Sequence, residues 1–153
     1  MMSATPFGNN AVCQVGLIVK DIEKTARKYC EVFGVDMPPI IVTLSYAIAK
    51  TTYRGKPCDV TAKLAFFNFG HAQIELIEPD PQSSVWRDYL DEHDESAHHI
   101  AFMVEDTEST MKHLQARGID VLQQGLYSDA SGMRTYVDSA PVLGVMVELL
   151  QSF

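Results

Sequence analysis

The stretch AHHIAFMV, residues 97–104, opens with two histidines and continues as a run of alternating side chains. In a β-strand, successive side chains point to opposite faces of the sheet. One face carries His98 followed only by apolar side chains, which suits packing against a helix. The other face carries His99 followed by Ala101, a small residue that leaves room. His99 is therefore expected to point into a cavity, whereas His98 is more simply a packing residue than a partner of a ligand.

Composition and charge narrow the classes of protein to which the chain can belong. Its 153 residues include 12 Lys and Arg and 20 Asp and Glu, for a formal net charge of −8. An acidic surface repels phosphate backbones, which argues against a nucleic-acid partner. No apolar run approaches the roughly 20 residues that span a bilayer. Residues 1–10 do not resemble a secretory signal and the three cysteines show no paired spacing, so we expect a cytoplasmic protein with reduced thiols.

The first part of the chain repeats the pattern that follows His99. From residue 12 an alternating strand leads to Asp21 in an N-cap position, a helical pattern follows, and Gly34 ends it. In the second part Asp106 takes the cap position, and the predicted helix runs to about residue 117 before Gly118. An offset of 85 residues superposes the two patterns and places Gln14 on His99. The sequence therefore predicts an internal duplication within one compact domain.

The remaining elements complete two modules. Residues 46–53, 63–69 and 73–77 are predicted strands of the first, and residues 134–137 and 145–150 are predicted strands of the second. Between the modules, Ser83 or Ser84 is expected to cap a short helix that ends in an acidic run. The second copy is 12 residues shorter between its ligand-bearing strands, and we place this shortfall around residues 125–133. The predicted division is residues 12–79 for the first βαβββ module, 80–96 for a linker with a short helix, and 97–151 for the second module.

Four predicted strands each carry one polar side chain on the face opposite their apolar residues: Gln14, Glu75, His99 and Glu148. An ionised glutamate among apolar strand residues is costly unless it is paired, neutralised or bound to a metal. Two glutamates at equivalent points of a duplicated unit favour a cation. One imidazole with carboxylate and amide oxygens suits a divalent ion such as Zn, Ni, Co or Mn. A non-haem iron oxygenase would normally present two histidines and one carboxylate, so oxygen chemistry is disfavoured.

The strands that carry these residues resemble the four signature strands of the vicinal oxygen chelate (VOC) superfamily. That superfamily includes glyoxalase I, methylmalonyl-CoA epimerase, bleomycin-resistance proteins and extradiol dioxygenases. The resemblance covers about residues 12–151 and implies an α+β fold, in which two tandem βαβββ modules form a curled mixed sheet around a central cavity, usually in a homodimer. It also implies that the four polar residues occupy the family's metal positions. The motifs that carry it are VGLIVKD (15–21), IELIEP (74–79), HHIAF (98–102) and GVMVEL (144–149).

The resemblance implies a metal-dependent isomerase or lyase of the glyoxalase type, similar to lactoylglutathione lyase or methylmalonyl-CoA epimerase. Such enzymes remove a proton next to a metal-bound carbonyl. Glu148 is the favoured base and also a ligand, and Glu75 is the second candidate. The epimerases carry a further glutamate base in the first module, whereas the only carboxylate between residues 37 and 74 here is Asp59. The alternative is a non-catalytic binding or sequestering protein of the bleomycin-resistance type.

The expected substrate is a small molecule, either a glutathione adduct or an acyl-CoA thioester. Both have anionic tails, which a cationic side chain can bind. The sequence does not single out one cation for this role. The candidates are Arg54, Lys56, Lys63 and Arg134.

Overall fold

The computed structural model describes residues 5–8 and 11–153, and two similar sets of elements account for most of them. The first set comprises β1 (Gln14–Ile18), α1 (Ile22–Phe33), β2 (Ile41–Val42), β5 (Ala62–Phe69) and β6 (Ala72–Pro79). The second comprises β7 (Ser96–Met103), α4 (Thr107–Gln115), β8 (Val121–Leu126), β9 (Gly132–Val137) and β10 (Met146–Ser152). The shorter or connecting elements are α2 (Tyr46–Ala49), β3 (Thr52–Tyr53), β4 (Lys56–Pro57), α3 (Val85–His93) and α5 (Ala140–Leu143).

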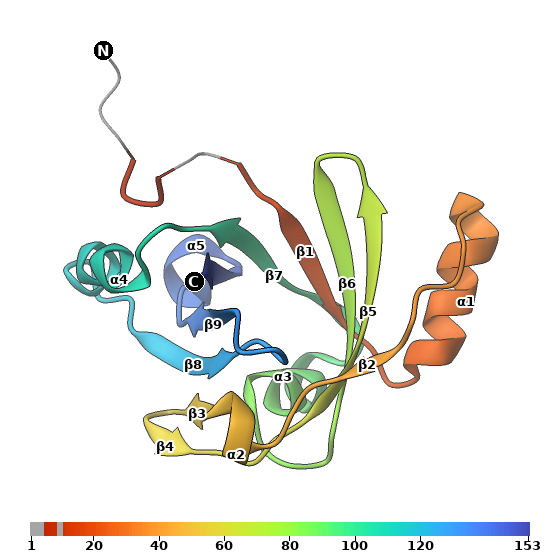
Figure 1. Cartoon of the computed structure of the whole chain (residues 1–153), viewed down its shortest axis with the longest axis horizontal. Helices are drawn as coiled ribbons and strands as arrows, with labels where there is room; N and C mark the ends of the chain where they lie inside the picture. Colours follow the sequence, from red (N-terminus) through yellow and green to blue (C-terminus); the bar gives the residue numbers. More distant parts are fainter. Residues whose placement is uncertain (1–4, 9–10) are drawn as a thin grey trace.

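All strands belong to one mixed sheet that curls into a half-barrel (Figure 1). The strand order is β2-β5-β6-β1-β7-β10-β9-β8-β3-β4. Helix α1 packs against β5 and β6, and α4 packs against β10, at opposite ends of the view in Figure 1. Helix α3 contacts β6, β1 and β7, where the two halves meet. The predicted α+β class with a curled mixed sheet is confirmed.

The strand registers reproduce the duplication residue by residue. In the first half β1 and β6 are parallel and pair Gly16 with Glu75. In the second half β7 and β10 are parallel and pair Ala101 with Glu148. The antiparallel pair β1–β7 joins the halves at the centre of the sheet. The four strands expected to carry metal ligands, β6, β1, β7 and β10, are therefore adjacent at the centre of the sheet. Alternate side chains of these strands point into the same concave space.

Capping side chains begin the helices as the sequence predicts. The Asp21 carboxylate accepts a hydrogen bond from the Lys24 amide at the start of α1, and Asp106 does the same for Ser109 at the start of α4. Ser84 caps α3. These bonds satisfy amides that have no partner inside the helix. They fix where each helix leaves its strand, and hence where the curled sheet is covered.

The predicted strand at residues 46–53 is wrong over its first half. Residues Tyr46–Ala49 form the short helix α2, because the Asp59 carboxylate accepts a hydrogen bond of 2.8 Å from the Tyr46 amide and offers the chain a local partner. After it, β3 pairs with β4 and, across the barrel, with β8 of the other half. The extra length of the first copy is therefore an insertion that extends the sheet of the second copy.

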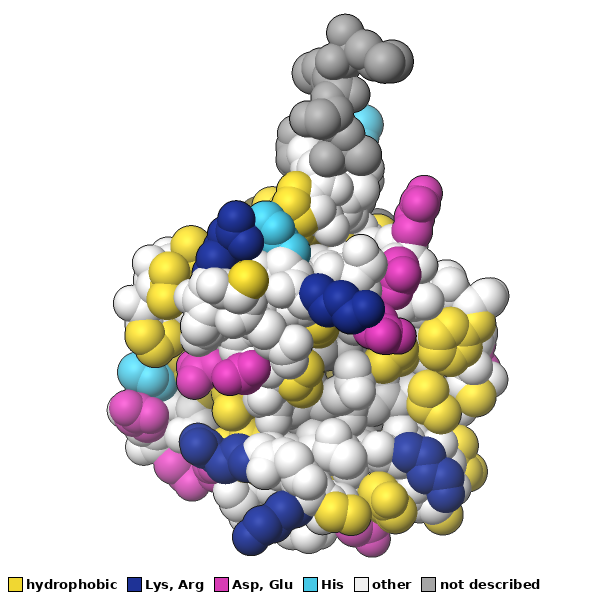
Figure 2. Space-filling view, turned by 90° about the vertical axis from the view of Figure 1, so that its left-hand side faces the viewer, with side chains coloured by type: hydrophobic (Ala, Val, Ile, Leu, Met, Phe, Trp, Pro, Cys, Tyr) yellow, Lys and Arg dark blue, Asp and Glu magenta, His cyan; other side chains and the backbone are white. Residues whose placement is uncertain are grey.

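One face of the molecule carries exposed side chains of both charges. Figure 2, which faces the side carrying α4 and β8 in Figure 1, shows cationic and acidic side chains interspersed, with no continuous basic patch on this face. None of the helices within the described ranges has the length and apolar character to cross a membrane.

Candidate metal centre

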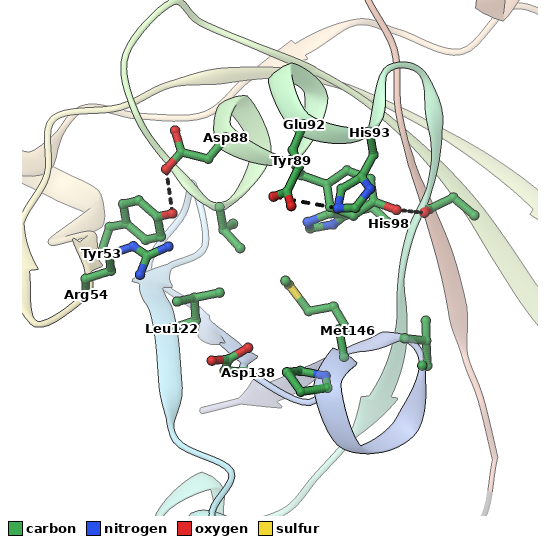
Figure 3. A pocket seen from close by; sticks show the side chains of 16 residues that line it. Tyr53, Arg54, Asp88, Tyr89, Glu92, His93, His98, Leu122, Asp138 and Met146 are labelled. Carbon is green, nitrogen blue, oxygen red and sulfur yellow. Dashed lines mark hydrogen bonds and ion pairs between the residues drawn. The ribbon is translucent and has the colours of Figure 1, made fainter.

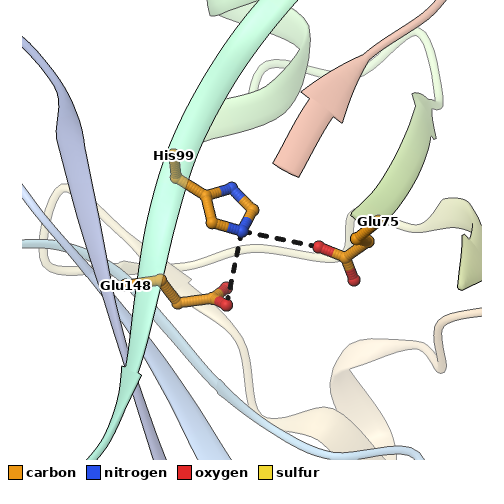
Figure 4. Close-up of side chains that lie close together, drawn as sticks. All are labelled: Glu75, His99 and Glu148. Atoms are coloured by element: carbon orange, nitrogen blue, oxygen red, sulfur yellow. Dashed lines mark ion pairs between the residues drawn. The ribbon is translucent and has the colours of Figure 1, made fainter. Parts of the chain in front are cut away.

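Three side chains from three of the four central strands converge inside the half-barrel. His99 of β7 lies between Glu75 of β6 and Glu148 of β10 (Figure 4). Its Nε2 atom is 3.6 Å from Glu75 Oε1 and 3.5 Å from Glu148 Oε1. One ligand atom from each residue lies within 4.8 Å of the others. The exposed fractions are 6% for Glu75, 1% for His99 and 2% for Glu148, so the cluster is screened from solvent.

Gln14 of β1 joins this cluster through its amide oxygen. Oε1 lies 3.0 Å from His99 Nε2, and the amide nitrogen donates to Gln73 Oε1 at 2.8 Å. Gln73 in turn donates to Asn68 Oδ1 at 3.1 Å. Because this chain of amides uses the nitrogen of Gln14 as a donor, its oxygen faces the imidazole. All four residues proposed from the sequence are thus brought together, and Gln73 is a supporting residue that the sequence did not reveal.

Small residues make room for these side chains. In the antiparallel pair β1–β7, Gln14 lies opposite Ala101, and Gly16 lies opposite His99. A Cβ atom at Gly16 would overlap the His99 ring at Cε1. The duplication therefore places each polar side chain against the small residue of the other copy. The larger imidazole requires glycine at that point, whereas the amide of Gln14 tolerates alanine.

His98 contacts the centre although strand alternation placed it on the packing face. The register of β1 and β7 shifts between Gly16 and Leu17, so one residue of β7 is left out of the pairing at His98. His98 Nδ1 then lies 2.9 Å from His99 Nδ1, while its ring meets the Tyr89 ring edge-on. If His99 held a metal through Nε2, its Nδ1 would carry the ring proton and would donate a hydrogen bond to His98 Nδ1. The interpretation of His98 as a packing residue is therefore incomplete.

Burial sets the protonation of the cluster. It raises the pKa of Glu148 to about 7, against smaller lowering effects of the Tyr136 hydrogen bond and the Arg134 charge. Burial, followed by repulsion from Glu148, raises the pKa of Glu75 well above its ordinary value. Burial lowers the pKa of His99 to about 3. At neutral pH the imidazole is neutral and able to coordinate, and the carboxylates retain protons that a cation would displace.

The donor set fits a divalent metal. It offers one neutral imidazole nitrogen, two carboxylates and one amide oxygen, which are ligand types used by Zn²⁺ and by the neighbouring transition ions. Two carboxylates buried this close together also lack any cationic side chain within ion-pair distance among the described residues. A divalent cation would neutralise both.

We expect the affinity for zinc to rise with pH. Below pH 7 Glu148 holds a proton that zinc must displace, and burial with repulsion from Glu148 makes Glu75 hold another. The apparent affinity should therefore increase at least about tenfold per unit between pH 5.5 and 6.5, and less steeply above pH 7. His99, with a pKa of about 3, releases no proton in this range. Competition with a chromophoric chelator from pH 5.5 to 8, with proton release followed by an indicator dye, measures both. A zinc affinity that does not change across this range would contradict the protonation described here.

Two cavities lie near the centre, one lined by members of the cluster and the other by His98. A cavity of about 280 Å³ adjoins the cluster and is lined by Gln14, Phe66, Gln73, Glu75, Tyr127, Arg134, Glu148 and Leu150. A second cavity of about 400 Å³ reaches His98 from the side of α3 and α5 (Figure 3). Arg54 lies at the edge of this second cavity beside Tyr53, whose hydroxyl donates to Asp88 at 2.7 Å. Of these two cavities, the smaller is the one lined by predicted ligands, namely Gln14, Glu75 and Glu148.

Trp86 and Tyr136 support the centre from within the barrel. The Trp86 indole donates to the Tyr136 hydroxyl at 3.0 Å, and both side chains are 1% exposed. Tyr136 lies opposite Glu148 in the β9–β10 register. The sequence suggested only a core or interface position for Trp86. Its contact with Tyr136 depends on packing between α3 and β9, for which no local pattern exists.

Comparison with known proteins agrees with this architecture. The model of the Glyoxalase/Bleomycin resistance protein/Dioxygenase superfamily matches residues 13–137. A search of curated proteins found no match.

Solved structures share the fold at low sequence identity. The methylmalonyl-CoA epimerase of Mycobacterium tuberculosis is 19% identical, with 100% of this chain and 93% of that chain covered and a TM-score of 0.62. A hypothetical protein of Bacillus halodurans is 17% identical, with 95% and 96% covered and a TM-score of 0.69. A variant of the Streptomyces coelicolor methylmalonyl-CoA epimerase, in complex with 2-nitronate-propionyl-CoA, is 20% identical, with 94% of each chain covered and a TM-score of 0.63.

Proposed function

Because the chain belongs to the glyoxalase/bleomycin resistance protein/dioxygenase superfamily, we propose that it is a metal-dependent isomerase or lyase that removes a proton next to a carbonyl group. The observation that carries this proposal is the buried cluster of Glu75, His99 and Glu148 beside a cavity. A divalent cation held by the cluster would stabilise the negative charge that develops on the carbonyl oxygen.

Glu148 is the proposed base. Without metal, burial raises the pKa of Glu148 to about 7. A Glu148 carboxylate that leaves the metal when substrate binds would therefore take up a proton near neutral pH. The Tyr136 hydroxyl and the Arg134 charge favour its ionised form, so that it remains able to accept a proton despite its burial. Glu75 is the second candidate, because it lines the same cavity.

Asp59 does not replace the glutamate base that epimerases carry in the first module. Its carboxylate accepts a hydrogen bond from the Tyr46 amide and it lines a different surface hollow, away from Glu148. Within the described part of the chain, the carboxylates of the cavity are those of Glu75 and Glu148. The proposed chemistry therefore depends on these two residues.

The proposed substrate is an acyl-CoA thioester or a glutathione adduct. Similar folds include an epimerase in complex with 2-nitronate-propionyl-CoA, which favours the thioester as the first compound to assay. The cavity of about 280 Å³ lies near the lower limit of typical ligand pockets, so it suits the reacting end of such a molecule. We further propose that the protein forms a homodimer, which sedimentation analysis can test.

The proposal is tested by proton exchange. The protein is loaded in turn with zinc, nickel, cobalt or manganese and incubated in deuterated water with methylmalonyl-CoA or with the methylglyoxal–glutathione adduct. We expect deuterium to enter one of these compounds, the exchange to stop when a chelator removes the metal, and metal to restore it. Equal exchange without metal would exclude the proposed mechanism. Tight binding without exchange would instead indicate a sequestering protein.

A further inference from the structure

Arg134 is the cationic side chain among the residues that line the cavity of the candidate metal centre. It lies on β9, two residues before Tyr136, and therefore on the same inward face of that strand. Its partner in β10 is Leu150, two residues beyond Glu148. Arg134 therefore lies two residues along the β9–β10 register from the pair Tyr136–Glu148, and it lines the same cavity as Glu148.

The Arg134 guanidinium is held in place without a carboxylate partner. Its central carbon lies 5.4 Å from the centre of the Trp86 ring, and the Trp86 indole is itself fixed by its hydrogen bond to Tyr136. Stacking on a buried ring orients the planar guanidinium and leaves its edge free to donate. Within the part of the chain that the structure describes, this guanidinium forms neither an ion pair nor a hydrogen bond. Tyr127 lines the same cavity.

The charges of the cavity do not balance once a cation is bound. Glu75 and Glu148 supply two negative charges when ionised, and a divalent metal would cancel both. The positive charge of the Arg134 guanidinium then remains uncompensated among the lining residues. A partly buried cation is most stable beside an anion, so the loaded site is complementary to a ligand with one negative charge.

We propose that Arg134 binds a carboxylate group of the substrate, next to the carbonyl that undergoes proton removal. This inference rests on the proposed function and specifies its substrate class: a small carbonyl compound that carries a carboxylate at its reacting end, rather than only on a distant tail. A planar guanidinium can donate two parallel hydrogen bonds to a carboxylate. Tyr127 lines the same cavity and is among the residues that such a carboxylate would meet.

The other three cations proposed from the sequence are placed elsewhere. Arg54 lines the larger cavity and stacks on Tyr53. Lys63 pairs with Glu78 at 3.8 Å. Lys56 lies exposed in β4. Arg54 therefore offers a matched control, because its substitution removes the same charge without touching the cavity of the metal centre.

The test compares two hydroxamates that chelate metals through the same pair of oxygens. Acetohydroxamate is neutral beyond its chelating group, whereas the monohydroxamate of malonic acid carries a carboxylate one carbon away. Binding of each to the zinc-loaded protein is measured by calorimetry for the unsubstituted protein, Arg134→Met, Arg134→Lys and Arg54→Met. Thermal unfolding and zinc content are recorded for every variant, so that loss of folding or metal is recognised.

We expect the unsubstituted protein to bind the carboxylate-bearing hydroxamate about tenfold more tightly or better, as for a charge-assisted pair of hydrogen bonds. Loss of the positive charge should weaken both anionic chelators, but Arg134→Met should abolish the preference between them. Arg134→Lys should retain part of the preference and Arg54→Met all of it. A preference that survives in Arg134→Met, or is absent from the unsubstituted protein, would overturn the inference.

Failure of the proposed function has a different signature. If no proton exchange is found but the preference depends on Arg134, the anion site stands and the enzyme assignment falls. If exchange is found but Arg134→Met keeps the preference for the carboxylate-bearing hydroxamate, the enzyme assignment stands and the anion site falls.

Discussion

Replacing Glu148 with glutamine should reduce metal-dependent proton exchange by roughly a hundredfold to ten-thousandfold, the range lost when a general base is removed. Glutamine has almost the same size and can still accept the Tyr136 hydrogen bond, so the fold should persist. It cannot take up a proton near neutral pH. The measurement is the rate of deuterium incorporation at saturating zinc, with zinc content confirmed for the variant.

Glu75→Gln is the matched control, since it removes an equivalent carboxylate from the other half of the barrel. It should weaken zinc binding, because one negative ligand is lost, yet retain most of the exchange once zinc saturates the site. The opposite ranking would identify Glu75 as the base. If Glu148→Gln exchanges protons at the original rate under these conditions, our assignment of the base is wrong.

Gly16→Ala should weaken zinc binding by roughly tenfold to a hundredfold, the range lost when the surroundings that orient a metal ligand are changed. The new Cβ atom would overlap the His99 ring, which is fully enclosed and must therefore rotate or push β1 away from β7. Overpacking of this kind costs about 1–3 kcal/mol of unfolding free energy. Chelator competition and chemical denaturation measure the two effects separately.

Gly34→Ala provides the control for the same substitution. Gly34 ends α1 with a φ of 67°, and a Cβ atom there would meet no neighbour within 4 Å. Alanine should therefore destabilise the protein by about 1 kcal/mol through backbone strain and leave zinc binding unchanged. Gly16→Ala protein that binds zinc as tightly as the Gly34→Ala protein would show that His99 does not need this space.

The duplication, the helix starts and the four inward-facing polar residues could all be predicted from the sequence. Each depends on local chemistry or on strand alternation: an aspartate before a helical pattern, a glycine after it, or a polar side chain among apolar ones on a strand. The offset of 85 residues that superposes Gln14 on His99 also relates Gly16 to Ala101, and these two residues pair with Glu75 and Glu148 in the equivalent registers β1–β6 and β7–β10. Because the two copies fold alike, equivalent positions in the sequence lie on the same inward face of the central strands.

Other features escaped sequence reasoning because they depend on contacts between distant segments. The helix at residues 46–49 forms where a strand was predicted, since the Asp59 carboxylate accepts a hydrogen bond from the Tyr46 amide. His98 reaches His99 because a register shift interrupts the alternation that had separated them. Neither a carboxylate thirteen residues away nor a bulge opposite another strand leaves a periodic trace in the chain.

What the sequence determined by itself is the type of unit and its repetition, because capping, turn chemistry and the two-residue period of a strand act over a few neighbouring residues. Only the tertiary structure decided which of the four cationic side chains lines the cavity of the candidate centre, and that the pKa values of the buried carboxylates are raised. Those properties follow from burial and from distances between strands that are remote in the chain. The curled sheet sets these distances when it brings β6, β1, β7 and β10 side by side.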